Sequence, residues 1–260
     1  MKKLVLKIFL GNLQNPLKMF SIYRKEINSF FSSLIGYIVI SVFLVSIGLF
    51  MWVFSDTSVL DYNFATMDQL FSIAPLVFLF LIPAVTMRSF AEEKATGTIE
   101  FLYTKPLTTF EIIGGKFFAN FTLVTFALIP TFIYYFSIYS LGSPVGNLDS
   151  GAILGSYIGL FFLSAAFVSI GMFASTLTNN QIVAFILGAF LCFFFHWAFT
   201  YIARMPIFTT TLDLFIQKIG INYHYGNISK GLIDSRDIIY FTSVIFVFLF
   251  GTITVMENRK

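Results

Sequence analysis

The run INSFFSSLIGYIVISVFLVSIGLFMWVFS, residues 27–55, contains no acidic, basic or histidine side chain. A helix needs about 20 mostly apolar residues to cross the roughly 30 Å of hydrocarbon in a lipid bilayer. Residues 33–54 satisfy that requirement, so the sequence predicts a membrane-spanning helix there. The chain as a whole holds 36 Phe, and these large apolar side chains lose nothing by facing acyl chains.

Five further stretches have the same apolar character. Two of the predicted spans contain proline: Pro75 and Pro83 fall in the second, and Pro130 falls in the third. Neighbouring helices can satisfy the carbonyls that proline leaves without a helical partner. The fourth is rich in Gly, Ala and Ser, which permit close helix packing, so it is expected inside the bundle. The five stretches are residues 69–87, 117–139, 151–177, 181–203 and 238–256.

The composition excludes a soluble protein. Only 11% of the residues are charged and 57% are hydrophobic, with a mean hydropathy of +0.85, whereas a soluble domain carries roughly 25% charged residues. The charges are too few to cover a surface in water, so lipid must surround the chain. The predicted fold class is an all-α polytopic membrane protein with six transmembrane helices. No block of basic residues alternates with aromatic ones, so nucleic acid is not an expected partner.

Basic residues are distributed unevenly among the predicted loops. Cytoplasmic loops carry the excess of Lys and Arg, whereas residues 56–68 hold three Asp and no basic residue. Both termini and residues 88–116 are therefore expected in the cytoplasm, with 56–68, 140–150 and 204–237 outside, in the cytoplasmic (inner) membrane. The basic residues are Lys2, Lys3, Lys7, Lys18, Arg24 and Lys25 before span one, Arg88, Lys94, Lys105 and Lys116 after span two, Arg259 and Lys260 at the end, and, against the pattern, Arg204, Lys218, Lys230 and Arg236 outside.

A helix before the first span is predicted to lie along the cytoplasmic surface, within an N-terminal segment 1–32. Asn15 and Pro16 favour a helix start, and apolar residues then recur at three- and four-residue spacing. Such an amphipathic helix is expected in the bilayer interface; the alternative is a plain extension of span one. The apolar residues are Phe20, Tyr23, Ile27, Phe30, Phe31 and Leu34, and the polar ones are Lys18, Ser21, Arg24, Lys25 and Asn28.

Two helix breakers divide the cytoplasmic segment 88–116. The charged stretch RSFAEEKATG is typical of a helix that ends at Gly97, and TIEFLYTK is a short segment between that glycine and Pro106. Its apolar residues would suit a groove on a soluble partner, whereas an ordinary solvated loop is the alternative. Those apolar residues are Ile99, Phe101, Leu102 and Tyr103.

A capping box follows the second breaker. Thr108 and Glu111 have the spacing at which a hydroxyl and a carboxylate cap the first turn of a helix. The helix that they begin is expected to continue through Gly114-Gly115-Lys116 into span three.

The segment 221–237 precedes the last span on the predicted outer side. Gly226 and Gly231 interrupt it, and Asp234 and Asp237 lie where a carboxylate favours the dipole at a helix N-terminus. We expect a short helix or re-entrant turn here that caps the pathway externally. The aromatic cluster expected as an interfacial anchor consists of Tyr223, His224 and Tyr225.

Three motifs carry a family resemblance. They are Arg88-x-Phe90-x-x-Glu93-Lys94-x-x-Gly97-Thr98-x-Glu100-x-Leu102-x-x-x-Pro106, Ser175-x-Leu177-Thr178-x-Asn180-Gln181-x-x-Ala184 and Gly231-x-Ile233-Asp234-x-Arg236-Asp237-x-x-Tyr240. Together they resemble the ABC-2 type transporter permeases, in which an interfacial helix also precedes six spans. The resemblance covers nearly the whole chain, with 33–256 as the permease domain and 257–260 as a cytoplasmic tail. Within the family the chain is most similar to the gliding-motility permease subunits of Bacteroidota.

The resemblance implies partners and a function. A separate ABC ATPase subunit grips a coupling helix after the second span, and a second permease half, identical or different, completes the pathway. The chain would move a substrate outward without being an enzyme itself, in a role in gliding motility. The implied ATPase-coupling residues are Arg88, Glu92, Glu93, Lys94, Gly97, Thr98, Glu100, Phe101, Leu102 and Pro106, and the implied external gate is Gly231, Asp234, Arg236 and Asp237. The turn 178–181 departs from a cytoplasmic pattern because it lacks Lys and Arg.

No catalytic or cofactor site is predicted. Gly114-Gly115-Lys116 is followed by Phe117, which offers no hydroxyl for magnesium, so no phosphate-binding loop is present. Cys192 has no metal-ligand companions at usable spacing. His196, deep in span five, is expected to be neutral and hydrogen-bonded to a neighbouring helix, although a buried ionisable group in a membrane also suggests a function.

Two other functions compete with transport. A membrane scaffold or assembly subunit would need the cytoplasmic docking segment but would not depend on nucleotide. A membrane-embedded enzyme is disfavoured because no His, Asp or Glu residues cluster within the predicted spans.

The predicted topology is testable by cysteine labelling. In a Cys192→Ser background, a cysteine at Lys105 should react only with membrane-permeant reagents, because the basic-residue asymmetry places this residue in the cytoplasm. A cysteine at Asp61 should react from outside and serves as the control. Selective labelling of position 105 from outside would overturn the topology.

Overall fold

All regular structure in the described residues is helical. The computed structural model describes residues 16–62, 64–205, 210–232 and 234–258, and within them there is no strand. Six helices are long and apolar enough to cross a membrane, which confirms the six predicted spans. Residues named above that lie outside the described ones are Lys2, Lys3, Lys7, Asn15, Ile233, Arg259 and Lys260.

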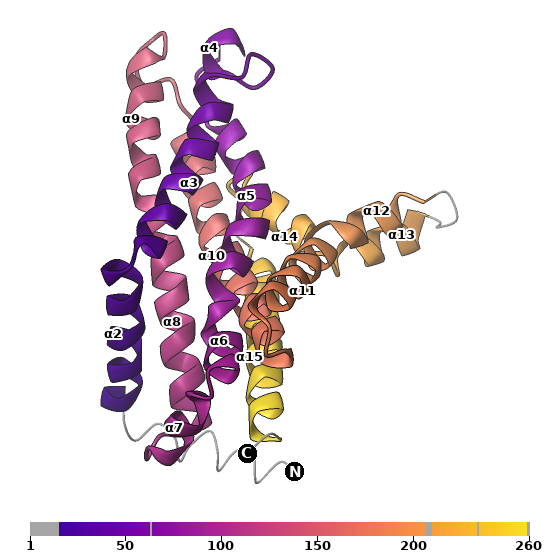
Figure 1. The fold of residues 1–260 in the computed structure, drawn as a ribbon. Coiled ribbons are helices and arrows are strands. Elements are labelled where there is room, and N and C mark those ends of the chain that lie inside the picture. The colour runs from indigo at the N-terminus through magenta and orange to yellow at the C-terminus, as the bar shows by residue number, and fades with distance from the viewer. Residues whose placement is uncertain (1–15, 63, 206–209, 233, 259–260) are drawn as a thin grey trace.

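The six spans follow the predicted order, and several are built from more than one helix (Figure 1). Shorter helices connect them or lie at the ends of the bundle. The spans are α3 (Leu34–Trp52), α5 with α6 (Asp68–Thr86 and Arg88–Ala95), α8 with η2 and α9 (Thr109–Leu128, Ile129–Thr131 and Phe132–Leu141), α10 (Ser150–Leu177), α11 with η3 and α12 (Gln181–Phe193, Phe194–Ala198 and Phe199–Ala203) and α15 (Ser235–Glu257). The shorter helices are α2 (Pro16–Ser32), α4 (Val59–Tyr62), α7 (Ile99–Thr104), α13 (Thr210–Gln217) and α14 (Ile221–Ile228).

Helix α10 forms the centre of the bundle. It packs against α5, α8, α11 and α15. In an apolar stretch of 18 residues, 67% of α10 is buried, compared with 11% of α15. Its small residues explain this position. A Cβ atom at Gly171 would lie 2.1 Å from Oγ1 of Thr86 on α5, so only glycine allows the two helices to approach this closely. The interior position predicted for this span is therefore confirmed.

Helix α2 is separate from the first span. The chain bends at Ser33, whose side chain accepts a hydrogen bond from the amide of Ile35 and so caps α3. On its inner side α2 packs Ile22 directly over Gly115 of α8. Phe20 remains 57% exposed, which suits a helix with lipid along its outer side. A plain extension of span one is therefore wrong, whereas the interfacial location of α2 stays a prediction.

Span five leans away from the rest of the bundle, as the orange helices α11 and α12 show in Figure 1. It contains one wide π-helical turn, η3, in which His196 is 1% exposed. The expected hydrogen bond to a neighbouring helix is not observed, because Nδ1 of His196 has no partner among the described residues. Its ring instead lies edge-on to Phe167 and Trp197, so this expectation is corrected.

The contact of α10 with α5 yields a stability prediction. Gly171→Ala places a methyl group against Thr86 Oγ1, which is fixed by its 2.9 Å hydrogen bond to the carbonyl of Ile82. We expect a loss of about 1–3 kcal/mol in the free energy of unfolding, the usual cost of overpacking. Chemical unfolding in mixed micelles measures it. The control is Gly226→Ala, whose methyl group meets nothing within 4 Å. Equal stability of the two variants would contradict this account of the packing.

Candidate functional site

The segment 88–116 has the local structure that its sequence predicts. Helix α6 ends before Gly97, which adopts a φ of +71° that disfavours other residues. Helix α7 follows, and Pro106 lies just after its end. The amide of Thr108 donates to Oε2 of Glu111 at 2.8 Å, and the amide of Glu111 donates to Oγ1 of Thr108 at 3.2 Å. The predicted capping box is thus confirmed, and it begins the helix α8 that enters span three.

Ser175 of α10 holds the start of α6. Its Oγ accepts hydrogen bonds from the amides of Phe90 and Ala91, at 3.1 and 3.0 Å, and donates to the carbonyl of Met87 at 2.9 Å. The backbone turns at Met87, where α5 passes into α6, and Ser175 gives hydrogen-bond partners to the two amides and the carbonyl at this turn. At the other end of α6, Nζ of Lys94 donates to the carbonyl of Thr176. Helix α6 is therefore fixed along the end of α10.

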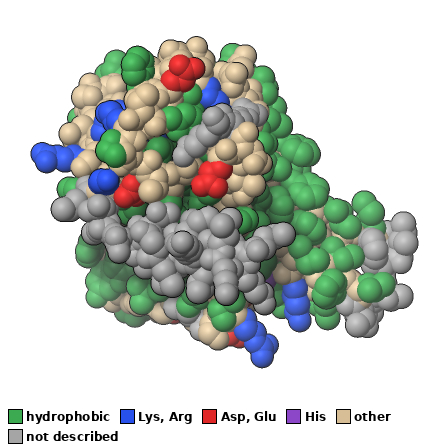
Figure 2. Space-filling view, turned by 90° about the horizontal axis from the view of Figure 1, so that it is seen from below, with side chains coloured by type: hydrophobic (Ala, Val, Ile, Leu, Met, Phe, Trp, Pro, Cys, Tyr) green, Lys and Arg blue, Asp and Glu red, His purple; other side chains and the backbone are tan. Residues whose placement is uncertain are grey.

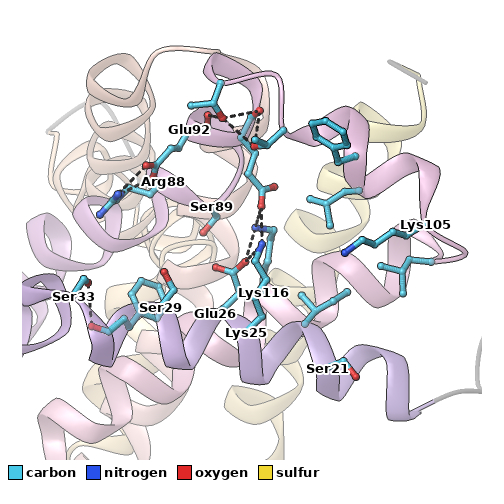
Figure 3. Close-up of a pocket in the computed structure, with 18 of the residues that line it drawn as sticks. Ser21, Lys25, Glu26, Ser29, Ser33, Arg88, Ser89, Glu92, Lys105 and Lys116 are labelled. Carbon is cyan, nitrogen blue, oxygen red and sulfur yellow. Dashed lines mark hydrogen bonds and ion pairs between the residues drawn. The ribbon is translucent and has the colours of Figure 1, made fainter.

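A buried lysine on α8 joins α8 to α2 and α6. Lys116 on α8 is 1% exposed, and its Nζ lies 3.0 Å from Oε1 of Glu26 on α2 and 2.8 Å from Oε1 of Glu93 on α6. Lys25 completes the cluster at 3.6 Å from Glu26 and 3.7 Å from Glu93. Figure 3 shows Lys116 beside Lys25 and Glu26. The Lys116 cluster, as we call these four residues, balances two cations with two carboxylates.

Burial makes the Lys116 cluster sensitive to the loss of Lys116, Glu26 or Glu93, whereas the side chain of Lys25 is 63% exposed. Moving an ion out of water costs several kcal/mol even after relaxation, and only a close opposite charge offsets that cost. The side chain of Glu93 is only 13% exposed and its Oε2 has no partner among the described residues. Glu93 therefore does not lie on a solvated surface. Its role is to anchor α6 to α8.

A second polar contact lies one turn deeper along α8. Nδ2 of Asn120 donates to Oγ of Ser89 at 2.9 Å and to the carbonyl of Lys116 at 2.8 Å. Asn120 is 2% exposed, so water cannot replace these bonds. The junction of α6 with α8 is consequently held by an ionic contact and by a neutral contact.

A cleft of about 880 Å³ opens between α2 and the α6–α7 segment. Figure 2 shows this end of the molecule, and most of the charged side chains visible there lie over one part of the face. Figure 3 looks into the cleft. Arg88 and Glu92 form a bidentate pair on its wall at 2.6 and 2.8 Å. Nζ of Lys18 donates to the carbonyl of Pro106 at 2.9 Å, which connects α2 with the chain that follows α7.

The structure brings most of the implied coupling residues to this cleft. Arg88, Glu92, Glu93, Thr98, Phe101, Leu102 and Pro106 line it. Three do not. Lys94 is directed to α10, Gly97 forms the turn between α6 and α7, and Glu100 is exposed elsewhere on α7. Phe101 is 70% exposed, although its side chain is large and apolar.

The residues of the implied external gate occupy different environments. Gly231 adopts a φ of +80° and packs against Ala152. Asp234 caps α15. Its carboxylate accepts a hydrogen bond from the amide of Arg236, and this bond holds the pKa of the carboxyl below the usual range. Arg236 is exposed. Asp237 is 3% exposed.

The expected aromatic anchor was wrong for two of its three members. His224 and Tyr225 are buried rather than exposed to an interface. Oδ1 of Asp237 lies 2.6 Å from Nδ1 of His224, and the hydroxyl of Tyr225 donates to the carbonyl of Phe71 at 2.6 Å. The segment is nevertheless helical, as predicted, over α14.

Sequence reasoning missed the residues that position the site. Lys116 was counted among the basic residues after span two, on a helix expected to enter span three, and neither it nor Glu26 was given a role. One signal was available: a single Lys after two glycines, at the start of a long apolar helix, needs a buried counter-ion if that helix packs closely. Among the described residues no group of three His, Cys, Asp or Glu side chains gathers as metal ligands.

One family model matches most of the chain. The model of the ABC-2 family transporter proteins matches residues 20–256. The chain belongs to the ABC-2 transporter family. It is accordingly a multi-pass transmembrane permease subunit, and members of this family are membrane subunits without catalytic activity of their own. The match begins within α2 and ends in α15, so it includes the Lys116 cluster and every residue that lines the cleft except Lys18. No curated protein matches the chain.

The Lys116 cluster generates the second stability prediction. Lys116→Met removes the buried ammonium and leaves two buried carboxylates facing each other, so we expect a loss of about 3–5 kcal/mol in the free energy of unfolding. Glu26→Gln and Glu93→Gln added to Lys116→Met should restore most of it, because no buried charge is then left alone. Unfolding in mixed micelles measures both.

The control variant is Arg88→Ala, which breaks a pair whose side chains are 34% and 36% exposed. An exposed pair contributes up to about 1 kcal/mol, so this change should be small. If Lys116→Met were no more destabilising than Arg88→Ala, the cluster would not hold the three helices together.

Proposed function

We propose that the chain is the membrane subunit of an exporter, and that a separate ABC ATPase subunit drives it by docking on α7. The observation that carries this proposal is the state of Phe101. It is 70% exposed on a helix that buries none of its own residues, between two breakers and beside a charged cleft. An apolar side chain rimmed by charge is typical of a surface that a partner covers.

Helix α7 is connected to the spans by contacts that would transmit its movement. Oγ1 of Thr98 donates to the carbonyl of Glu93 at 3.3 Å, across the turn at Gly97. Glu93 is in turn bound to Lys116 on α8, and Ser175 ties the start of α6 to α10. A displacement of α7 by the ATPase would therefore reach spans two, three and four together, whereas a solvated loop would absorb it.

A second permease half, identical or different, is part of the proposal. Its place is the apolar groove of about 460 Å³ between α3, α5 and α11. Ile38, Phe80 and Phe185 line it from the three helices, and Ser46 is the only polar residue among its lining. Helix α11 packs on α10 but leans away from the rest of the bundle beside this groove (Figure 1), so one half alone does not close it. Two halves facing each other there would enclose a pathway.

The role in gliding motility and the outward direction of transport rest on the resemblance of the three motifs to the gliding-motility permeases. The inner membrane and the cytoplasmic position of both termini rest on the basic-residue asymmetry. Helix α2 begins, and helix α15 ends, near the end of the bundle at which α7 lies (Figure 1). This arrangement agrees with an even number of spans.

Docking on α7 predicts a loss of the ATPase when its apolar contact is removed. The double variant Phe101→Ala/Leu102→Ala should retain membrane insertion but lose the co-purifying ATPase, because a few apolar anchors carry most of an interface's binding energy. Glu100→Ala should weaken the contact less, since Glu100 is exposed to solvent. Pull-down of the ATPase from solubilised membranes is the measurement.

The matched control is Phe110→Ala, which removes another exposed Phe, 40% exposed, outside α7. It should retain the ATPase. Full retention by the double variant would remove the coupling role of α7. A crosslink from a cysteine at position 101 to the ATPase separates transport from the scaffold alternative, because only a transporter requires its yield to change with nucleotide.

A further inference from the structure

A buried histidine and a buried aspartate join α14 to the last span. His224 on α14 is 9% exposed and Asp237 in the first turn of α15 is 3% exposed, with 2.6 Å between Nδ1 and Oδ1. The other ring nitrogen, Nε2, lies 2.9 Å from the carbonyl oxygen of Lys218. The ring of Tyr240 stacks on the imidazole at 3.8 Å between centroids. The ring is thus held on both edges and on one face.

Both ring nitrogens of His224 face hydrogen-bond acceptors. The carbonyl of Lys218 can only accept, so Nε2 must carry a hydrogen. A carboxylate also only accepts, so the contact of Nδ1 with Asp237 at 2.6 Å requires a further proton between them. A neutral imidazole beside an ionised carboxylate lacks that proton. Its Nδ1 lone pair would then face a carboxylate oxygen at a repulsive distance, or the ring would give up Lys218.

We propose that His224 and Asp237 form a proton-dependent latch between α14 and α15, closed while the shared proton is present and released when a rise in pH removes it. The other contacts of α14 do not involve this proton. The hydroxyl of Tyr225 donates to the carbonyl of Phe71 on α5, and Oγ of Ser156 on α10 donates to the carbonyl of Ser229 at 2.9 Å. Helix α14 therefore stays on α5 and α10 when the latch opens, and its junction with α15 loosens.

The neighbouring titratable groups leave His224 and Asp237 as the pair that responds. From α15, Asp234 and Arg236 are exposed, and the hydroxyl of Tyr240 donates to the carbonyl of Ile219 at 2.5 Å. Helix α10 contains no charged residue and contributes Tyr157, which bonds to Thr131. From η3, His196 approaches the ring of Tyr225. On α14 itself Tyr223 touches His224 edge-on, and Lys218, just before it, is exposed.

The latch adds regulation to the external gate of the proposed function. If α14 closes the outer mouth of the pathway, the pH of the outer medium would set how firmly the mouth is shut. The geometry does not require transport, however, so the latch is tested on the chain alone. Failure of the ATPase pull-down leaves the latch intact, and failure of the latch leaves the permease function intact.

The proton itself is observable by nitrogen NMR of histidine. The chain has 2 His, so a His196→Phe variant labelled with ¹⁵N-histidine in lipid nanodiscs reports on His224 alone. At low pH we expect Nδ1 to share a proton with Asp237, either by carrying it or by accepting it from the carboxyl, and we expect the Nδ1 signal to become that of a bare nitrogen as the pH is raised. An Nδ1 signal that shows no shared proton at any pH would overturn the proposal.

The movement is measured as a distance between spin labels. Cysteines replace Gly226 on α14, where a side chain meets nothing within 4 Å, and Ile239 on α15, which is 67% exposed, in a Cys192→Ser background. A second, longer distance should appear with rising pH, following the NMR transition. An unchanged distance distribution across the NMR transition would overturn the latch.

Two aspartate variants decide whether this pair is the cause. Asp237→Asn lets the amide donate to Nδ1 while Nε2 still donates to Lys218, so a neutral His224 satisfies both contacts and the latch should stay closed at every pH. Asp234→Asn makes the same chemical change at the exposed helix cap and should keep the response of the parent. An Asp237→Asn response that matches the parent would refute the proposal.

Discussion

The buried ammonium of Lys116 is the constraint on which the end of the molecule around α2, α6 and α7 depends. Two carboxylates from α2 and α6 lie 3.0 and 2.8 Å from it, and none of the three charges can move away without leaving the others uncompensated in a medium that solvates them poorly. This fixes α2 and α6 against α8 at the same level. The cleft between them and the projection of α7 beyond the bundle follow from that arrangement, and with them the proposed place of the ATPase.

Much of the fold could be predicted because it depends on chemistry between residues close in sequence. The lengths of the apolar runs determine the spans, Gly97 ends a helix because it adopts a positive φ, and Thr108 bonds with Glu111 three residues later. The interior position of α10 was also predictable, since small residues are informative wherever helices must approach closely. In each case the sequence contains both partners, or the lack of a side chain is itself the signal.

The candidate site was predicted only in part, because its contacts join distant segments. Glu92 and Glu93 are adjacent acids in a charged helix, yet one pairs with Arg88 at the surface and the other with Lys116 inside. Which of them turns inward depends on the rotation of α6 about its axis, and Ser175 of α10 sets that rotation. Counting basic residues in loops assigns sides of a membrane but says nothing about burial. Lys116 was therefore placed on the correct segment in the wrong environment.

The bonds of Ser175 restrict which amino acids can evolve at that position. One oxygen must accept from two backbone amides and also give a proton to a carbonyl, at a site that is 0% exposed. Only a hydroxyl on a short side chain does all three, so Ser and, if its methyl group finds room, Thr are the permitted residues. Alanine, which would be unremarked elsewhere in this small-residue helix, leaves two buried amides without a partner. At many positions of α10 one small residue should therefore be able to replace another during evolution. At position 175 only a small residue with a hydroxyl group should be accepted.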